Sequence, residues 1–454
     1  MKSTRFASIL TSLLIAGCAS SATNYSNGGS GALPNVEFAL QGRNATAAHY
    51  ILTELKSLGG NASSAASINQ IGWITGTSNR VGDHYSEAVL WRDRDPQPLG
   101  TLGGPNSGID WPNHNDRELT AGISETRKTN PLNEDWSCQA FFPTVPDTKR
   151  ICLGFAWHPD RMVPLGTLGG YDSYAAGTNN RGQIVGWAET PVHDATCTAA
   201  THFPNSFYQV LQFEPVFWTA EGDIHRLPTL PGDPDGAATA TNDNGVVVGI
   251  SGKCDQAVGR FTAAHAVYWQ NGVVHDIGGF GGISWNTPQD VNKWGHIVGF
   301  ANLPGDSQGQ LQPMAFFWSK ERGLTKIRPL PGDTNTEANG LNDFDQVVGV
   351  SANANTGAAR AFIWENGRTM DLNCFVPPNS PLHLLVANDI NDRGVIVGQA
   401  LVRGTTRAPA FLATPPQDWD AATAIPLQSD VRAPILPRAM YSNVMGRVRA
   451  RPGR

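Results

Sequence analysis

The chain has 454 residues, enough for two or three average domains or for one large repeat architecture. Only 16% of the residues are charged and 40% are hydrophobic, which argues against a disordered chain, a coiled coil or a basic nucleic-acid binder. The 49 glycines exceed the roughly 7% of average usage and follow no collagen period. This glycine content indicates many tight turns and therefore many short strands. The formal charge of −6 indicates no particular partner.

Residues 1–17 have the pattern of an export signal. Two cations precede an apolar core that is too short to span a bilayer but suits a signal peptide. The core ends in small residues directly before Cys18, and this resembles the lipobox of bacterial lipoproteins, in which the cysteine is diacylated. The resemblance implies an exported lipoprotein, sorted to the outer membrane. The alternative is an ordinary signal peptide, cut near Ala19 or Ala22, that leaves a freely secreted protein.

Residues 18–45 are rich in Ser, Ala, Asn and Gly, a composition typical of a flexible tether. A repeated pattern follows from residue 46 to residue 414. Its first signature is an asparagine followed seven residues later by a glycine, around a turn and an apolar strand. The pairs are Asn69 and Gly76, Asn115 and Gly122, Asn179 and Gly186, Asn242 and Gly249, Asn292 and Gly299, Asn342 and Gly349, and Asn391 and Gly398.

Two further signatures accompany each copy. A short apolar strand ends in tryptophan at Trp91, Trp157, Trp218, Trp269, Trp318 and Trp364, and in Ala413 in the last copy. Eight or nine residues after each tryptophan, a segment of the type Leu-x-x-Leu-x-Gly begins at Leu99, Leu165, Leu227, Ile277, Ile327 and, in degenerate form, Leu372. One more such segment begins at Leu55, before the first copy. The regular period of the tryptophans predicts that they pack between repeat units.

These spacings give four short strands per unit, which we call A to D in chain order. Four-strand units of this length are typical of β-propeller blades. The last unit stops after strand C, while an unpaired strand D lies near residues 50–55. We therefore predict an all-β fold, a seven-bladed β-propeller in which the N-terminal strand completes the last blade and removes the open edge. An open β-solenoid is the alternative, but it would not explain the offset between the first and last units.

The repeat resembles the HAF family of extracellular repeats. The family motif resembles Leu-Gly-Thr-Leu-Gly-Gly, then Ile-Asn-x-x-Gly-x-Val-Val-Gly, then His-Ala-Phe-x-Trp. Residues 99–104 and 165–170 match the first part to the letter, whereas the namesake histidine occurs only at His265. The resemblance covers residues 50–413 and implies an exported propeller-like protein. The family has no established activity or site residues to transfer.

The connections between strands B and C are the most variable part of the repeat. From the strand-B glycine to the end of strand C the spacing is 15 residues in the shortest units, but 35 and 32 in the second and third. Insertions confined to one face of a repeat scaffold indicate a binding surface. We predict that the B–C and D–A connections form this surface. Its candidate ligand-binding residues are Trp111, Trp136, Tyr174, His193, His202, Tyr208 and Trp285. The alternative is that these side chains pack the loops onto the blades.

The remaining cysteines suggest two disulfides in these loops. Cys138 and Cys152 lie in one insertion, and Cys197 and Cys254 lie in neighbouring B–C connections, which suits an oxidising compartment. This leaves Cys374 unpaired. The sequence predicts no cofactor and no recognised metal motif. Asp172, Asp233, Asp235 and other acidic residues of the D–A loops offer oxygens that Ca²⁺ would accept, although backbone capping is the commoner reason for aspartate in such turns.

For function, we expect a non-catalytic scaffold that binds an envelope protein or a glycan through the B–C and D–A face. The alternative is an extracytoplasmic polysaccharide hydrolase or lyase on the same face, with catalytic residues unknown. A carboxylate pair and a histidine at the mouth of the central channel would favour the enzyme, and an aromatic-lined face would favour binding. We expect no nucleic-acid partner, and membrane contact only through the lipid anchor. The Pro- and Arg-rich tail, residues 415–454, is predicted to be disordered, with docking on the acidic propeller or on an anionic surface as the alternatives.

Overall fold

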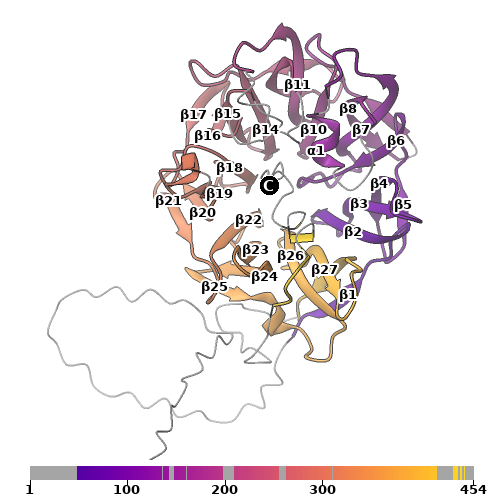
Figure 1. Cartoon of the computed structure of the whole chain (residues 1–454), viewed down its shortest axis with the longest axis vertical. Coiled ribbons are helices and arrows are strands. Elements are labelled where there is room, and N and C mark those ends of the chain that lie inside the picture. Colours follow the sequence, from indigo (N-terminus) through magenta and orange to yellow (C-terminus); the bar gives the residue numbers. More distant parts are fainter. Residues whose placement is uncertain are drawn as a thin grey trace, which may run out of the picture.

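The computed structural model describes residues 49–134, 136–142, 148–159, 161–197, 209–254, 262–308, 310–416, 433–437, 440–441 and 444. These residues form seven antiparallel four-stranded sheets, which follow one another in chain order around a central axis (Figure 1). The predicted seven-bladed β-propeller is therefore confirmed. Among the described residues, helix is limited to the four residues of α1, two short 3₁₀ turns and Met440, Tyr441 and Val444 near the C-terminus, and no helix there is long and apolar enough to cross a membrane.

The first four blades each run from an inner strand A to an outer strand D. Blade 1 contains β2 (Gly59–Ile68), β3 (Ile74–Arg80), β4 (Ser86–Trp91) and β5 (Pro96–Pro98). Blade 2 contains β6 (Gly103–Gly108), β7 (Thr120–Thr129), β8 (Arg150–His158) and β9 (Arg161–Pro164), with α1 (Cys138–Phe141) between β7 and β8. Blade 3 contains β10 (Ser173–Thr178), β11 (Ile184–His193), β12 (Leu211–Trp218) and β13 (Ile224–Arg226). Blade 4 contains β14 (Asp235–Thr241), β15 (Val247–Gly252), β16 (His265–Gln270) and β17 (Val273–Asp276).

The last three blades complete the ring. Blade 5 contains β18 (Thr287–Val291), β19 (Ile297–Asn302), β20 (Pro313–Ser319) and β21 (Gly323–Ile327), with a 3₁₀ turn at Asp306–Gln308. Blade 6 contains β22 (Asn335–Leu341), β23 (Val347–Asn353), β24 (Ala358–Glu365) and β25 (Arg368–Asp371), followed by a 3₁₀ turn at Leu372–Phe375. Blade 7 contains β26 (Leu382–Ile390), β27 (Ile396–Val402), β28 (Ala410–Thr414) and β1 (Ile51–Glu54).

Blade 7 is closed by the first strand of the described chain. β1 pairs antiparallel with β28, so that Ile51 lies opposite Thr414 and Glu54 opposite Phe411. This is the predicted closure by an N-terminal strand. It leaves no unpaired edge between the first and last repeat units, which is the edge that would otherwise be open to association with another chain.

The seven repeated asparagines form a closed ring of hydrogen bonds between blades. Each side-chain Oδ1 accepts the backbone N–H of the residue four positions later, which shapes the turn between strands A and B. Each Nδ2 donates to the main-chain oxygen of the asparagine in the next blade, at 2.6 to 3.1 Å. The last donation, from Asn391 to Asn69, closes the circle. Asparagine is required because aspartate would accept the turn hydrogen bonds but could not donate to the next blade.

The tryptophan and leucine signatures also connect neighbouring blades. The indole N–H of Trp91, at the end of β4, donates to the Lys56 carbonyl 2.9 Å away, and that of Trp269 donates to Pro228 at 2.7 Å. Each acceptor directly follows the first leucine of a Leu-x-x-Leu segment in the preceding blade. Trp91 and Trp269 are buried. These contacts support the predicted packing role of the strand-C tryptophans.

The described part of the C-terminal tail packs on blades 6 and 7. Ile435 forms a bridge with Ala358 at the start of β24, and the Leu436 N–H donates to the Gly357 carbonyl. Leu436 and Val444 are buried against Val350, Ala352, Ala359, Leu385, Val386 and Leu401. This segment therefore docks on the propeller through apolar contacts.

Candidate functional site

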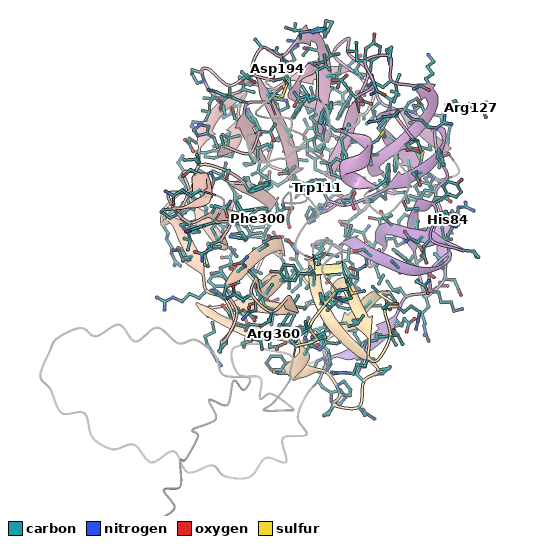
Figure 2. All side chains as sticks on the ribbon, in the orientation of Figure 1. His84, Trp111, Arg127, Asp194, Phe300 and Arg360 are labelled. Carbon is teal, nitrogen blue, oxygen red and sulfur yellow. A yellow bond between two sulfur atoms is a disulfide. The ribbon has the colours of Figure 1, made fainter. Side chains whose placement is uncertain are left out.

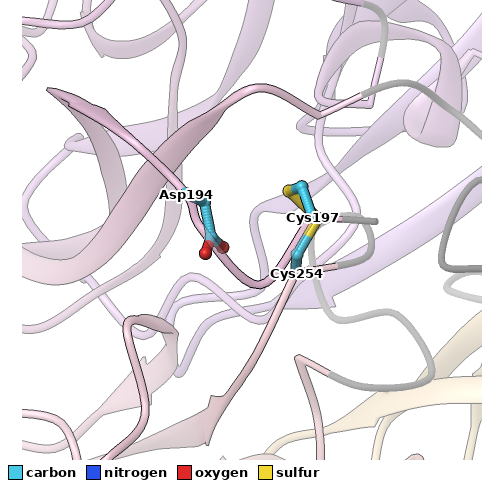
Figure 3. A group of neighbouring side chains, drawn as sticks. All are labelled: Asp194, Cys197 and Cys254. Carbon is cyan, nitrogen blue, oxygen red and sulfur yellow. A yellow bond between two sulfur atoms is a disulfide. The ribbon is translucent and has the colours of Figure 1, made fainter. Parts of the chain in front are cut away.

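The B–C and D–A connections lie on one face, which we call the loop face, and the A–B and C–D turns lie on the other, the turn face. On the loop face, two disulfides hold the long insertions. Cys138 and Cys152 join α1 to β8 within blade 2, with their Cα atoms 5.5 Å apart. Cys197 and Cys254 join the blade 3 insertion to the loop after β15 in blade 4, with a Cα separation of 5.0 Å (Figure 3). Both expected loop disulfides are present.

One expectation about the cysteines is wrong. Cys374, in the 3₁₀ turn after β25, was expected to remain unpaired, but it is buried and disulfide-bonded. Its partner lies outside the described residues. Cys18, the predicted lipidation site, also lies outside them.

Most of the aromatic candidates on the loop face are buried and not exposed. Trp111 and Tyr174 have 1% and 0% of their surface accessible, and their ring centroids are 5.3 Å apart in an edge-to-face contact. Trp111 follows β6 near the central axis (Figure 2), and Tyr174 lies within β10, so neither is in a free D–A loop. Trp136 is fully buried and stacks on Phe213, with ring centroids 4.3 Å apart. The expectation that these rings are presented to a ligand is corrected, because they pack the insertions onto blades 2 and 3.

The other predicted ligand-binding residues differ in how exposed they are and in whether the structure describes them. Trp285, before β18, is also buried, with 5% of its surface accessible, so it belongs to the same correction. His193, at the end of β11, is exposed on the loop face. His202 and Tyr208 lie outside the described residues. Of the seven predicted residues, His193 is thus the one that the described structure presents to solvent.

Buried carboxylates connect the blade 2 insertion to blade 3. Glu134, in that insertion, accepts the backbone N–H groups of Val210 and Leu211, at 2.6 and 2.9 Å. Glu189, in β11, accepts the indole N–H of Trp136 at 2.9 Å. Its second oxygen accepts the backbone N–H groups of the D–A loop at 2.8 and 3.0 Å. Neither Glu134 nor Glu189 was predicted as a site, because a single Glu inside an insertion has no spacing that marks it.

Asp172 completes this connection. It precedes β10, and its two oxygens accept the Cys152 backbone N–H at 2.6 Å and the Asn130 side-chain N–H at 2.8 Å. Both donors belong to blade 2. Burial, followed by the charges of Asp172 and Glu134, raises the pKa of Glu189 well above its ordinary value. Burial also raises the pKa of Glu134.

A second carboxylate pair lies where the insertions of blades 3 and 4 meet. Asp194 accepts the backbone N–H and the hydroxyl of Thr196, both at 2.7 Å, and the Thr196 hydroxyl accepts the Cys254 N–H at 2.9 Å. Asp235, at the start of β14, accepts the Phe213 N–H at 2.9 Å. Burial and the neighbouring Asp194 raise the pKa of Asp235 well above its usual value. Because Cys197 and Cys254 are bonded to each other, their sulfurs cannot serve as thiolate ligands for a metal beside Asp194.

The turn face has a histidine and two aspartates inside the central channel. His114 Nε2 lies 2.9 Å from Asp290 Oδ1, reaching from blade 2 to blade 5 across the axis. The nearest polar atoms of His114, Asp290 and Asp389 lie within 4.8 Å of one another. Burial opposes protonation of the imidazole, but the charge and hydrogen bond of Asp290 outweigh it and raise the pKa of His114 to about 10. Burial raises the pKa of Asp389 to about 7.

These channel carboxylates are already committed to hydrogen bonds with the backbone. Asp290 accepts the Val291 N–H at 2.7 Å and the Leu341 N–H at 3.0 Å. Asp389 accepts the N–H groups of Ile68 and Ile390, both at 2.8 Å. The histidine and carboxylate pair expected of an enzyme is therefore present, but on the face opposite to the insertions. A histidine that stays protonated at neutral pH is also not available there as a general base.

Above His114, the turn face has a small cavity of about 120 Å³. Its lining includes the four aspartates Asp116, Asp243, Asp343 and Asp392, together with Lys293. These residues directly follow the ring asparagines and form an outer set of interblade hydrogen bonds, such as Gln70 N–H to Asp116 at 2.9 Å and Asp343 N–H to Asp392 at 2.9 Å. The cavity is the polar entrance of the channel, and its side chains also hold neighbouring turns together.

The comparisons with known proteins concern the fold. No family model and no curated protein matches the chain. Among solved structures, the acylaminoacyl peptidase of Pyrococcus horikoshii is 10% identical with a TM-score of 0.45, and the match covers 80% of this chain and 54% of the peptidase. The chain thus spans about half the length of that protein.

Two lyase structures are also similar. A streptogramin B lyase is 9% identical with a TM-score of 0.44, covering 81% of this chain and 98% of the lyase. A catalytically inactive virginiamycin B lyase from Staphylococcus aureus, with quinupristin, is 10% identical with a TM-score of 0.44, covering 80% of this chain and 99% of that one.

Proposed function

We propose that the protein is an exported, non-catalytic binding scaffold that recognises an envelope protein or a glycan through its loop face. The observation that carries this proposal is the way the insertions of blades 2, 3 and 4 are joined into one platform. The Cys197–Cys254 disulfide connects blades 3 and 4, and Glu134 connects the blade 2 insertion to β12 of blade 3. Long loops held in one arrangement lose little conformational entropy when they bind a partner.

The chemistry of the described ionisable groups supports binding over catalysis. The buried carboxylates of the loop face accept backbone N–H groups and have almost no surface open to a substrate. His114 lies on the other face. The alternative predicted from the sequence, a polysaccharide hydrolase or lyase, needs accessible acid and base groups on the loop face.

The export part of the proposal depends on the N-terminal segment and the resemblance to the HAF repeats. We propose that Cys18 carries a lipid that anchors the protein to the outer membrane, so that contact with the membrane is through the lipid alone. This lipid occupies the Cys18 sulfur, so in the anchored protein Cys374 is not bonded to Cys18. The two described disulfides support an oxidising compartment. Mass spectrometry of the mature N-terminus tests this directly: a diacylated Cys18 is expected, whereas an unmodified N-terminus near residue 20 or 23 would indicate free secretion.

The binding proposal is tested with the mature chain on a glycan array and in pull-downs from envelope fractions. The test variant replaces residues 198–206 with a short Gly-Ser linker, which leaves Cys197 and the Gln209 segment in place. The matched control is Trp294→Ala with Phe344→Ala, two exposed aromatic residues of the turn face. We expect the linker variant to lose a partner that the control retains. Release of oligosaccharide from an added polysaccharide would favour the enzyme, and a partner retained by both variants would contradict the loop-face proposal.

A further inference from the structure

Three carboxyl groups from separate segments meet beneath the loop face. Glu134 belongs to the blade 2 insertion, Asp172 to the loop before β10, and Glu189 to β11. One carboxylate oxygen from each lies within 4.8 Å of the other two. The residues are 0%, 2% and 0% accessible, respectively. The cluster is therefore a pocket of hard oxygen atoms closed off from bulk water.

The hydrogen bonds described above do not use all of these oxygens. Glu134 Oε1 accepts two backbone N–H groups, whereas its Oε2 is buried and accepts no hydrogen bond of good geometry, although the Asn130 side chain is close enough to lower the pKa of the carboxyl. Nor does any lysine or arginine in the described part of the chain form an ion pair with Glu134 or Glu189. A buried carboxylate oxygen without a partner costs about 1–3 kcal/mol or more, so its place in a cluster of three indicates that a cation completes the site.

The chemistry of the ligands selects the kind of cation. Ca²⁺ accepts six to eight oxygen ligands in a flexible geometry at about 2.3–2.6 Å. Mg²⁺ demands near-ideal octahedral geometry at about 2.0–2.1 Å and dehydrates reluctantly, so carboxylates from three separate segments suit it less well. Three carboxylates also supply the negative charge that a divalent ion requires, with water as the source of the remaining ligands.

We propose that Glu134, Asp172 and Glu189 bind a divalent cation, and that Ca²⁺ is the preferred ion. The ion would join the blade 2 insertion to two segments of blade 3 and so fix one end of the loop platform. This inference does not depend on which partner the platform binds.

Trp136 provides a direct spectroscopic test. Its indole N–H is 2.9 Å from Glu189 Oε1, so Tb³⁺ bound in place of Ca²⁺ would be excited by energy transfer from this side chain. We expect tryptophan-sensitised Tb³⁺ emission from the metal-stripped protein, and we expect added Ca²⁺ to remove it. Trp136→Phe should lose most of the emission while thermal stabilisation by Ca²⁺ is retained. Wild-type protein with no sensitised emission, or with emission that millimolar Ca²⁺ does not change, would overturn the proposal.

Thermal unfolding with added CaCl₂ or MgCl₂ tests the ligands. At a free Ca²⁺ concentration about 100 times the Kd, the melting temperature should rise by about 3 °C or more, with a smaller rise for Mg²⁺. Glu134→Gln should abolish the Ca²⁺-dependent rise. The matched control is Asp306→Asn, which alters a buried carboxylate that holds the D–A loop of blade 5 through the Ile283 and Ser284 N–H groups; it should keep the rise. An equal rise in melting temperature in wild type and Glu134→Gln would contradict the site. If Glu134→Gln does not fold, calorimetric titration of the wild type with Ca²⁺ replaces this comparison, and absence of binding would contradict the site.

Discussion

The turn face and the loop face of the propeller are held together by two different sets of contacts. On the turn face, one asparagine per blade repeats the same hydrogen bond to its neighbour until Asn391 returns to Asn69. On the loop face, the contacts occur once each, as in the Cys197–Cys254 disulfide and the Glu134 hydrogen bonds to blade 3. The two sets of contacts therefore have different roles. The repeated ring holds the seven blades together, while the single contacts hold the insertions of blades 2 to 4 in one arrangement.

The largest expected effect comes from removing the interblade disulfide of the loop face. Cys197 and Cys254 are 57 residues apart, so their bond constrains a long segment of the unfolded chain. Cys197→Ser with Cys254→Ser should lower the free energy of unfolding by about 4 kcal/mol in chemical denaturation. The same exchange at Cys138 and Cys152, 14 residues apart, should cost about 3 kcal/mol. If the short loop cost more than the long one, the entropic account of this disulfide would be wrong.

Replacing one ring asparagine by aspartate tests the hydrogen bonds of the turn face, because it exchanges the donating side-chain nitrogen for an oxygen. In Asn242→Asp, the turn hydrogen bonds to the N–H groups of Asn244 and Val246 stay, but the donation to the Asn292 carbonyl, 2.7 Å away, is lost. The new carboxylate would be buried against a carbonyl oxygen, so we expect a loss of about 2–3 kcal/mol in urea denaturation at neutral pH.

The matched control for the ring lies two residues further on. The exposed Asn244 donates to the Lys293 carbonyl at 2.7 Å, and Asn244→Asp should cost less than about 1 kcal/mol because water replaces the lost bond. Burial should raise the pKa of the carboxyl in Asn242→Asp, so stability should recover at acidic pH in that variant alone. Equal losses in the two variants would show that the ring contributes nothing beyond ordinary surface hydrogen bonds.

The two faces also differ in how far the sequence could predict them. The spacing of the asparagines, tryptophans and leucines predicts the blades, and the orphan segment at Leu55 predicts the closure by β1. The interblade role of the asparagines was missed, although it left a signal: all seven copies have asparagine where aspartate or serine could also shape the turn. The turn requires only an acceptor at this position, whereas the contact to the next blade requires the N–H donor that asparagine has and aspartate lacks.

The loop face could not be predicted to the same depth. The two disulfides followed from cysteine placement, but Trp111 and Tyr174 were expected at the surface and are buried against each other. Aromatic residues in an insertion serve equally well as a ligand platform or as a local core. The sequence carries no spacing that separates these outcomes, because each ring also packs on a residue of another blade, as Trp111 does on Tyr174. The proximity of Glu134 and Glu189 could not be predicted for the same reason, since the two residues belong to different blades.

The channel histidine makes the stability of the turn face fall at alkaline pH. The pKa of His114 is about 10 in the fold, above the ordinary value of about 6.5. Its stabilisation is therefore complete below pH 6.5 and is lost as the pH rises through about 10. Because His114 is coupled to Asp290 and Asp389, we expect a loss on the order of 1–2 kcal/mol between pH 7 and pH 10.5. Unfolding curves of wild type and His114→Gln should converge at high pH, whereas exposed His84→Gln should follow the wild type throughout.

The smallest expected effect is also the one that most directly assigns the binding face. Trp294 and Phe344 are 63% and 68% accessible beside the acidic entrance of the channel, and the Trp294 indole makes an exposed hydrogen bond to the Asp343 carbonyl. Trp294→Ala and Phe344→Ala should each change the free energy of unfolding by less than about 1 kcal/mol and leave partner capture unchanged. If stability is retained but capture is lost, the partner binds at the asparagine ring, and the insertions of blades 2 to 4 serve the fold.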